Sequence, residues 1–169
     1  MGCDIHLFIE YKVGDKPWQT DSHHICEDNY LRDVSVSYRN YRLFGALAGI
    51  RNRVDYGAEA KGLPDDVSNS IKEESDRWDY DGHGHSYSSL EEFKQALKLS
   101  ESFEDKDIEP IAFYDMYSNI TQEYGYTNLL AYCEKQIKEF QIELEVEKHL
   151  LGQDINTDVQ CRLVYFFDN

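Results

Sequence analysis

The chain of 169 residues has little of what marks disordered, disulfide-rich or membrane proteins. It contains only 3 prolines and 4 cysteines, and no C-x-x-C pair that would signal a zinc knuckle or a redox motif. No apolar run approaches the roughly 20 residues that cross a bilayer. The first ten residues include acids and lack the basic leader and apolar stretch of a signal peptide. We therefore expect one folded domain, residues 1–169, in the cytoplasm, with its cysteines as buried thiols.

Basic side chains are also few. The sequence has 17 lysines and arginines against 33 aspartates and glutamates, which gives a formal net charge of -16. A surface of this sign repels long polyanions and anionic lipid headgroups. Duplex nucleic acid and membranes are therefore excluded as expected partners.

Hydrophobic alternation predicts two strands, one near each end of the chain. Residues 4–12 alternate between apolar and largely polar positions, which predicts a strand with one polar face. That polar face would carry Asp4, His6, Phe8 and Glu10. Turn residues follow at 14–17, and the chain around Trp18 is the expected hairpin partner. Residues 159–169 are β-branched, aromatic and apolar on both faces toward their end, which is typical of a central strand.

Apolar positions spaced three and four apart predict helices between these strands. The expected ranges are 38–50, 65–78, 90–99 and 127–151, with loops at 51–64, 79–86 and 101–109. The seam of the longest helix would be Leu130, Cys133, Ile137, Phe140, Leu144 and Leu151, and this helix is also the expected contact of a homo-oligomer. The fold class is therefore α+β: a small antiparallel or mixed sheet including both terminal strands, covered by the long C-terminal helix and the shorter helices.

Two short motifs combine carboxylate and imidazole groups. Asp4 and His6 are two residues apart on the first predicted strand, so both project from the same face. In Gly82-His83-Gly84-His85, the glycines let an extended segment approach closely and direct alternate imidazoles to one side. We predict Asp4, His6, His83 and His85 as catalytic residues and as ligands of a divalent metal. The alternative is an Asp4–His6 hydrogen bond and two polar loop histidines.

These two motifs resemble the outer motifs of calcineurin-like metallophosphoesterases, in which a D-x-H and a later G-H-x-H ligate a two-metal centre. The resemblance implies metal-assisted phosphoester hydrolysis by the same four residues. The intervening G-D and G-N-H-[DE] motifs of that family have no match in this chain, and the family's doubly wound fold is considerably longer.

The arginines give a second, independent signal. Five of the seven lie within residues 32–53, beside the single acid Asp33, so this segment carries a charge of +4 on a molecule of -16. Guanidinium forks match phosphate oxygens, and the interleaved Tyr38, Tyr41 and Phe44 could stack a base. The predicted ligand-binding residues are Arg39, Tyr41, Arg42, Arg51, Asn52 and Arg53. The alternative is that these arginines pair with surplus carboxylates.

Further motifs lie along nearly the whole chain outside the long helix. They are Met1-Gly2-Cys3-Asp4-Ile5-His6, Arg39-Asn40-Tyr41 with Leu43-Phe44, Leu47-Ala48-Gly49-Ile50-Arg51-Asn52, Gly62-Leu63-Pro64-Asp65-Asp66-Val67-Ser68, Trp78 with Asp81-Gly82-His83, and Phe167-Asp168-Asn169. This pattern resembles a recurrent family of small bacteriophage-encoded proteins. Where such relatives have Pro-Arg before Gly-Leu-Pro, this chain has Ala60-Lys61, which keeps the positive charge but loses the guanidinium fork. The resemblance implies a viral origin and a location in the host cytoplasm, not a mechanism.

Three functions remain open from the sequence. First, a phage-type counter-defence protein would bind a small phosphorylated ligand such as a nucleotide immune second messenger. With a metal bound, it would be a phosphodiesterase or other phosphoester hydrolase in which the cation activates water and Arg51 or Arg53 neutralises developing charge. Second, an acidic DNA mimic or protein-interaction inhibitor would block a host defence effector without catalysis. Third, the protein would be a structural component of a virion.

Overall fold

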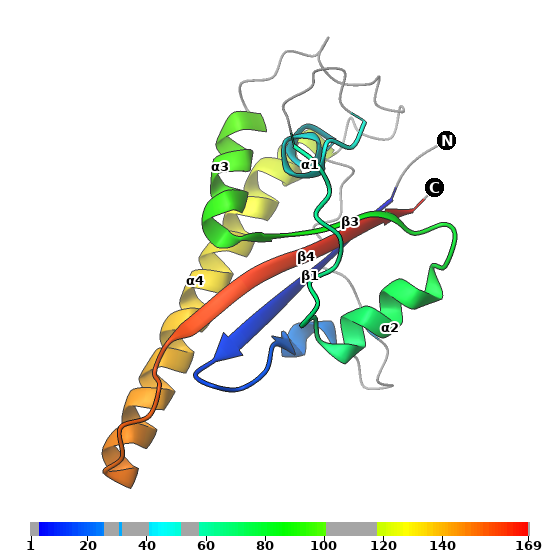
Figure 1. The fold of residues 1–169 in the computed structure, drawn as a ribbon. Helices are drawn as coiled ribbons and strands as arrows, with labels where there is room; N and C mark the ends of the chain where they lie inside the picture. The colour runs from blue at the N-terminus through cyan, green and yellow to red at the C-terminus, as the bar shows by residue number, and fades with distance from the viewer. Residues whose placement is uncertain (1–3, 26–30, 32–40, 52–57, 101–117, 169) are drawn as a thin grey trace.

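A computed structural model of the chain describes residues 4–25, 31, 41–51, 58–100 and 118–168 (Figure 1). The elements in chain order are β1 (Asp4–Val13), β2 (Gln19–Thr20), a 3-10 turn η1 (Ser22–His24), α1 (Tyr41–Ala48), α2 (Asn69–Arg77), β3 (His83–Ser89), α3 (Leu90–Ser100), α4 (Ser118–Leu151) and β4 (Val159–Asp168). The acidic run 101–109 and the residues at 38–40 lie outside the described part.

The two terminal strands form the centre of the sheet. The strand order is β2-β1-β4-β3, and every pairing is antiparallel. β1 and β4 pair along their whole length, from Asp4 opposite Asp168 to Val13 opposite Val159. The α+β class, the hairpin partner near Trp18 and the central position of the last strand are therefore confirmed.

Helices cover both faces of this sheet (Figure 1). On one face, Leu7 and Tyr165 belong to a core shared with α1, α3 and α4. On the other face, Phe8 and Phe166 pack in a smaller core with α2. The polar face predicted for the first strand is covered over part of its length: α2 and the segment before it pack on that face, and both Phe8 and Glu10 are buried.

The second helix begins later than its expected start at residue 65. Asp66 accepts a hydrogen bond from Arg162 Nη1 at 2.7 Å, and the Ser68 hydroxyl lies 2.6 Å from Thr20 Oγ1. Both side chains therefore bind other elements, and Ser68 makes no side-chain cap although it occupies the N-cap position. α2 consequently starts at Asn69.

The third helix follows its prediction. The Ser89 N–H donates to Glu92 Oε2 at 2.8 Å, and the Glu92 N–H donates back to Ser89 Oγ at 3.2 Å. This reciprocal pair satisfies two backbone N–H groups that the first helical turn leaves without an intrahelical partner. It fixes the start of α3 directly after β3.

The histidine-containing segment is a strand over much of the range predicted as a loop at 79–86. β3 begins at His83 and pairs with β4, with an irregular register between its first and fourth residues. Gly84 occupies this irregularity with φ of 60°, and an added Cβ would lie 2.9 Å from both Ile50 Cδ1 and Phe167 Cδ2. Only glycine combines this backbone conformation with so close an approach.

The long helix is confirmed but begins at Ser118, earlier than expected. Of its predicted seam residues, Leu130, Cys133 and Leu144 are buried, Ile137 and Phe140 are partly buried, and Leu151 is exposed. In the described parts of the chain, none of the helices combines the length and apolar composition needed to cross a bilayer.

Candidate functional site

Two of the predicted metal ligands lie on either side of an aromatic ring. The His6 ring on β1 stacks on Phe166 of β4 with a centroid distance of 4.8 Å, and the His85 ring on β3 stacks on the same Phe166 at 5.2 Å. β4 runs between the two histidine-bearing strands, which places them two strand spacings, or about 9–10 Å, apart. The phenyl ring thus occupies the space in which a shared cation would sit.

The other two predicted ligands are directed elsewhere. The His83 ring lies 6.2 Å from Phe167, whose side chain belongs to the opposite face of the sheet from Phe166. The Asp4 side chain is exposed, and its backbone N–H donates to Asp168 Oδ1 at 3.1 Å. Among the residues that the structure describes, no three His, Cys, Asp or Glu side chains are grouped to hold a metal ion.

The face that carries His6 and His85 contains a compact polar and aromatic cluster. His85 Nε2 lies 2.8 Å from Ser75 Oγ of α2, and His6 Nε2 lies 3.6 Å from Asp168 Oδ2. Burial, with a smaller contribution from the charge of His83, lowers the pKa of His85 and favours its neutral form. Ser75 and Asp168 were not predicted as site residues, because they meet the histidines only through α2 docking and strand register.

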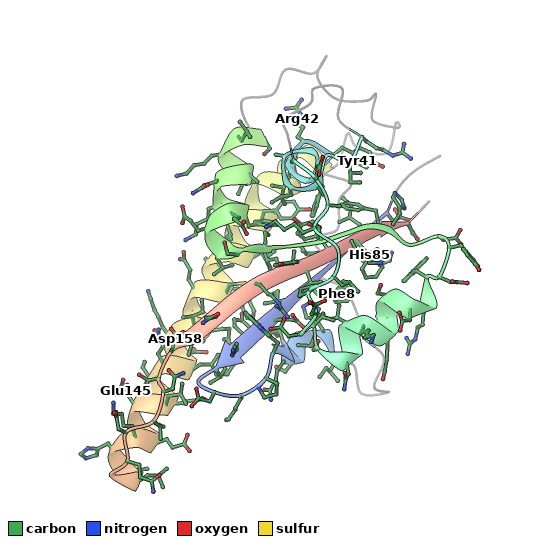
Figure 2. The ribbon with its side chains drawn as sticks, viewed as in Figure 1. Phe8, Tyr41, Arg42, His85, Glu145 and Asp158 are labelled. Atoms are coloured by element: carbon green, nitrogen blue, oxygen red, sulfur yellow. The ribbon has the colours of Figure 1, made fainter. Side chains whose placement is uncertain are left out.

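The described aromatic residues of the arginine-rich segment are buried and do not offer a ring to a ligand. Tyr41 and Phe44 were expected to stack a base, but both belong to the core formed by α1, and Phe44 is fully buried among aromatic rings. α1 places them there because it packs its apolar side on the sheet. Figure 2 shows Arg42 projecting from the side of α1 that is remote from the sheet. Arg39, Asn52 and Arg53 lie outside the described residues.

The end of this segment meets the histidine segment in space. Ile50 Cδ1 contacts Gly84, which brings the two segments together. Arg51 follows Ile50 in the chain and His83 precedes Gly84, so both lie next to this contact. The Arg51 guanidinium lies over the Tyr41 ring, with Cζ 5.7 Å from its centroid, which is the geometry of a cation–π pair. Arg51 has φ of 50°, a left-handed conformation that is uncommon outside glycine. We name Tyr41, Ile50, Arg51 and His83 the Arg51 corner.

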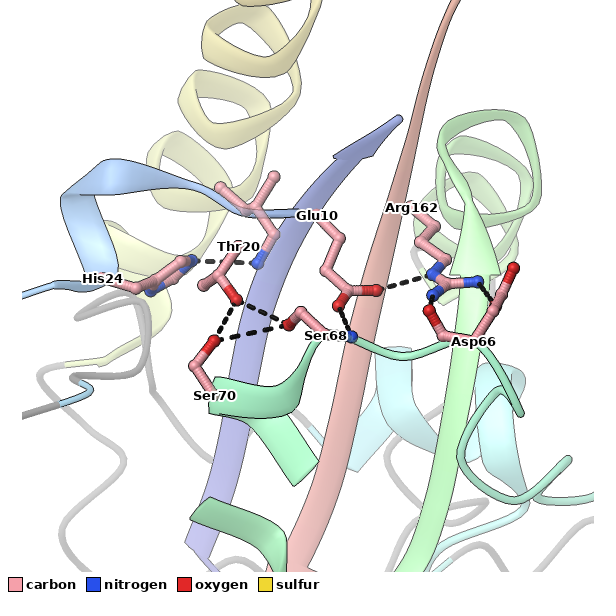
Figure 3. Close-up of polar contacts among 8 residues, drawn as sticks. Glu10, Thr20, His24, Asp66, Ser68, Ser70 and Arg162 are labelled. Atoms are coloured by element: carbon pink, nitrogen blue, oxygen red, sulfur yellow. Dashed lines mark hydrogen bonds and ion pairs between the residues drawn. The ribbon is translucent and has the colours of Figure 1, made fainter. Parts of the chain in front are cut away.

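A second polar network, which no motif in the sequence predicted, lies near β2 (Figure 3). Arg162 Nε donates to Glu10 Oε2 at 2.7 Å, and its Nη1 donates to Asp66 Oδ1 at 2.7 Å. Glu10 Oε1 accepts the Ser68 N–H at 2.6 Å, and the Arg162 guanidinium lies 3.9 Å from the Trp18 ring centroid. Every group here is held by the fold, so the network is structural. The sequence feature that could have indicated this network is Arg162, the single basic residue in a last strand that is otherwise mostly apolar.

Comparison of the chain with protein-family models, with curated proteins and with solved structures found no match.

Proposed function

We propose that the protein binds a small phosphorylated ligand at the Arg51 corner. The observation that carries this proposal is the contact of Ile50 with Gly84, which joins the arginine-rich segment to the histidine segment. Arg51 is half-buried, and the Tyr41 ring beneath it limits the freedom of its guanidinium. A guanidinium held in this way offers two parallel N–H donors to phosphate oxygens at a reduced entropic cost.

The geometry favours capture of the ligand over metal-assisted cleavage. Phe166 stands between His6 and His85, and His83 lies toward the opposite face of the sheet. The four residues predicted as metal ligands therefore offer no common point for a cation. In this proposal His83, whose Nδ1 lies 3.3 Å from the carbonyl oxygen of Asp81, is the second phosphate-binding group.

The proposed biological role is that of a phage-type counter-defence protein in the host cytoplasm. The resemblance to small bacteriophage proteins supports the viral setting, and the local positive charge of residues 32–53 supports a small anionic ligand on an otherwise acidic molecule. A nucleotide immune second messenger has this chemistry, and its sequestration alone would suppress the signal. Catalysis is not required.

Thermal unfolding tests this proposal with a panel of cyclic dinucleotides, cyclic trinucleotides and ADP-ribose derivatives. A ligand that binds the folded state raises the melting temperature by mass action. We expect at least one panel member to stabilise the protein, and Arg51→Lys to lose most of the shift because lysine lacks the planar fork. Arg77→Lys is the matched control, since Arg77 lies on α2 and pairs with Glu74 at 2.8 Å.

Two results would overturn the proposal. One is a melting temperature that no panel member raises. The other is an equal shift in the wild type and in Arg51→Lys, which would place the binding site away from the Arg51 corner.

A further inference from the structure

The C-terminal part of α4 carries an apolar face that no described element covers. Leu144 is buried near the β1–β2 turn, where its Cδ2 lies 3.9 Å from the Cβ position of Gly14. On the opposite side of the helix, Ile142, Val146 and Leu150 are 64%, 53% and 78% exposed. Their spacing of four aligns them in one ridge along the helix. Figure 1 shows this end of α4 extending past the tip of β1.

An acidic ridge runs beside the apolar one. Glu139, Glu143 and Glu147 have the same spacing of four, and Glu145 borders the other side of the apolar face (Figure 2). Lys138 and His149 also line that other side, so the ridge of Glu139, Glu143 and Glu147 is the flank that carries charge of one sign. Glu139 pairs with Lys135 at 3.6 Å, whereas within the described parts of the chain no ion pair is formed by Glu143, Glu145 or Glu147.

The charge pattern argues against a second copy as the occupant of this face. In an antiparallel pair of α4 helices centred on Val146, the acidic ridges of the two copies would lie side by side, with Glu143 near Glu147 of the other copy. Like charges at such positions repel, and each copy carries a net charge of -16. The acidic face is therefore complementary to a positively charged partner.

We propose that this face, residues 139–150 of α4, binds a basic amphipathic helix of a protein partner. The partner's apolar residues would pack on the ridge of Ile142, Val146 and Leu150, as in helix-in-groove recognition. Its flanking lysines or arginines would pair with the acidic ridge. This surface lies on the opposite side of α4 from the seam that docks on the sheet, so binding requires no rearrangement of the core.

Fluorescence anisotropy with a labelled Leu/Lys helical peptide of about 18 residues tests this proposal on the full chain, using a Leu/Glu peptide as the negative probe. We expect saturable binding of the Leu/Lys peptide that weakens with salt. Val146→Ser should weaken it about tenfold through lost apolar contact. The triple variant Glu139→Gln/Glu143→Gln/Glu147→Gln should weaken it by a similar factor. All four positions are exposed, so these variants should retain the wild-type melting temperature.

The matched charge control is Glu73→Gln/Asp76→Asn/Asp79→Asn, which removes three exposed acids at α2. We expect this variant to bind the peptide as the wild type does. Equal weakening by both triple variants would show attraction to net charge and overturn the proposal, as would no binding of the Leu/Lys peptide. Sedimentation equilibrium adds a third outcome: a dimer that Val146→Ser dissociates would assign the face to a second copy and overturn it as well.

Discussion

Arg162 Nε donates to Glu10 Oε2 at 2.7 Å, and this ion pair joins the two terminal strands at the centre of the sheet. Glu10 is fully buried and Arg162 nearly so. Residues 152 positions apart are thereby held in one register. A shift of the strands by one residue would bury each charge against an apolar neighbour, at a cost of several kcal/mol per ion.

Arg162→Met should lower the free energy of unfolding by about 3–5 kcal/mol, because it leaves the Glu10 carboxylate buried without its cation. Urea denaturation measures this loss. The double variant Arg162→Met/Glu10→Met should recover part of it, since an apolar pair carries no desolvation penalty while the Ser68 N–H and Asp66 lose their partners. A double variant as unstable as Arg162→Met would contradict this account of the pair.

Gly84→Ala should destabilise the protein more than Gly152→Ala does. Both glycines have nearly the same φ, 60° and 61°, so the backbone strain of about 1–2 kcal/mol is matched. The added methyl group at Gly84 meets Ile50 and Phe167, whereas no atom of the described residues lies within 4 Å of the same position at Gly152. The free energies of unfolding of the two variants, measured by chemical denaturation, should therefore differ, and equal losses would show that Ile50 and Phe167 pack loosely on Gly84.

Acidification should destabilise the fold through His85. Because burial lowers the pKa of His85 in the folded state, the unfolded chain takes up the proton at a higher pH. The stabilising contribution is complete above the unfolded pKa of about 6.5 and is lost as the pH falls through the lower folded pKa. Burial is the main cause of the lowered pKa of His85; the charge of His83 adds to it and the charge of Asp76 opposes it.

The measurement for His85 is the free energy of unfolding at pH 7.5 and 5.5, in the wild type and in His85→Asn. Carboxylates affect both proteins alike, so the difference between their pH dependences reports His85. We expect the variant to lose less stability on acidification. An identical loss would show that Ser75 and Phe166 accept the protonated ring without cost.

Ser89→Ala should cost about 1 kcal/mol, because it removes the hydroxyl that accepts the Glu92 N–H at the start of α3. Ser89→Asp should retain most of the stability, since aspartate is an equally good N-cap and its charge suits the helix N-terminus. Thermal unfolding of the two variants gives the comparison. Equal melting temperatures for alanine and aspartate would mean that the cap contributes nothing.

Local sequence patterns predicted most of the elements because their causes are local. The alternation in residues 4–12 and the seam of the 127–151 helix depend on side chains a few positions apart. The segment at 83–86 was predicted as a loop because its glycines and serines favour turns. Its strand conformation comes from pairing with β4, a partner about 80 positions away in the sequence.

The candidate site was less predictable than the fold. The sequence identified Arg51 and His83 by residue type, and the packing of Ile50 on Gly84 is what joins their segments. The proposed metal set of Asp4, His6, His83 and His85 depended on two motifs converging, and neither motif specifies which strand lies between them. Tyr41 and Phe44 have the composition of a stacking surface, but the same aromatic character also makes them core residues.

The sequence by itself determined the α+β class, the two terminal strands, the long helix and the acidic surface, because hydrophobic period and net charge are properties of neighbouring residues and of composition. Only the tertiary structure decided that β4 separates His6 from His85, that Arg162 is paired with Glu10, and that the arginine segment touches the histidine strand. These relationships depend on strand order and on register between distant segments. No local pattern in the sequence specifies strand order or register, so these relationships are seen only once the chain is folded.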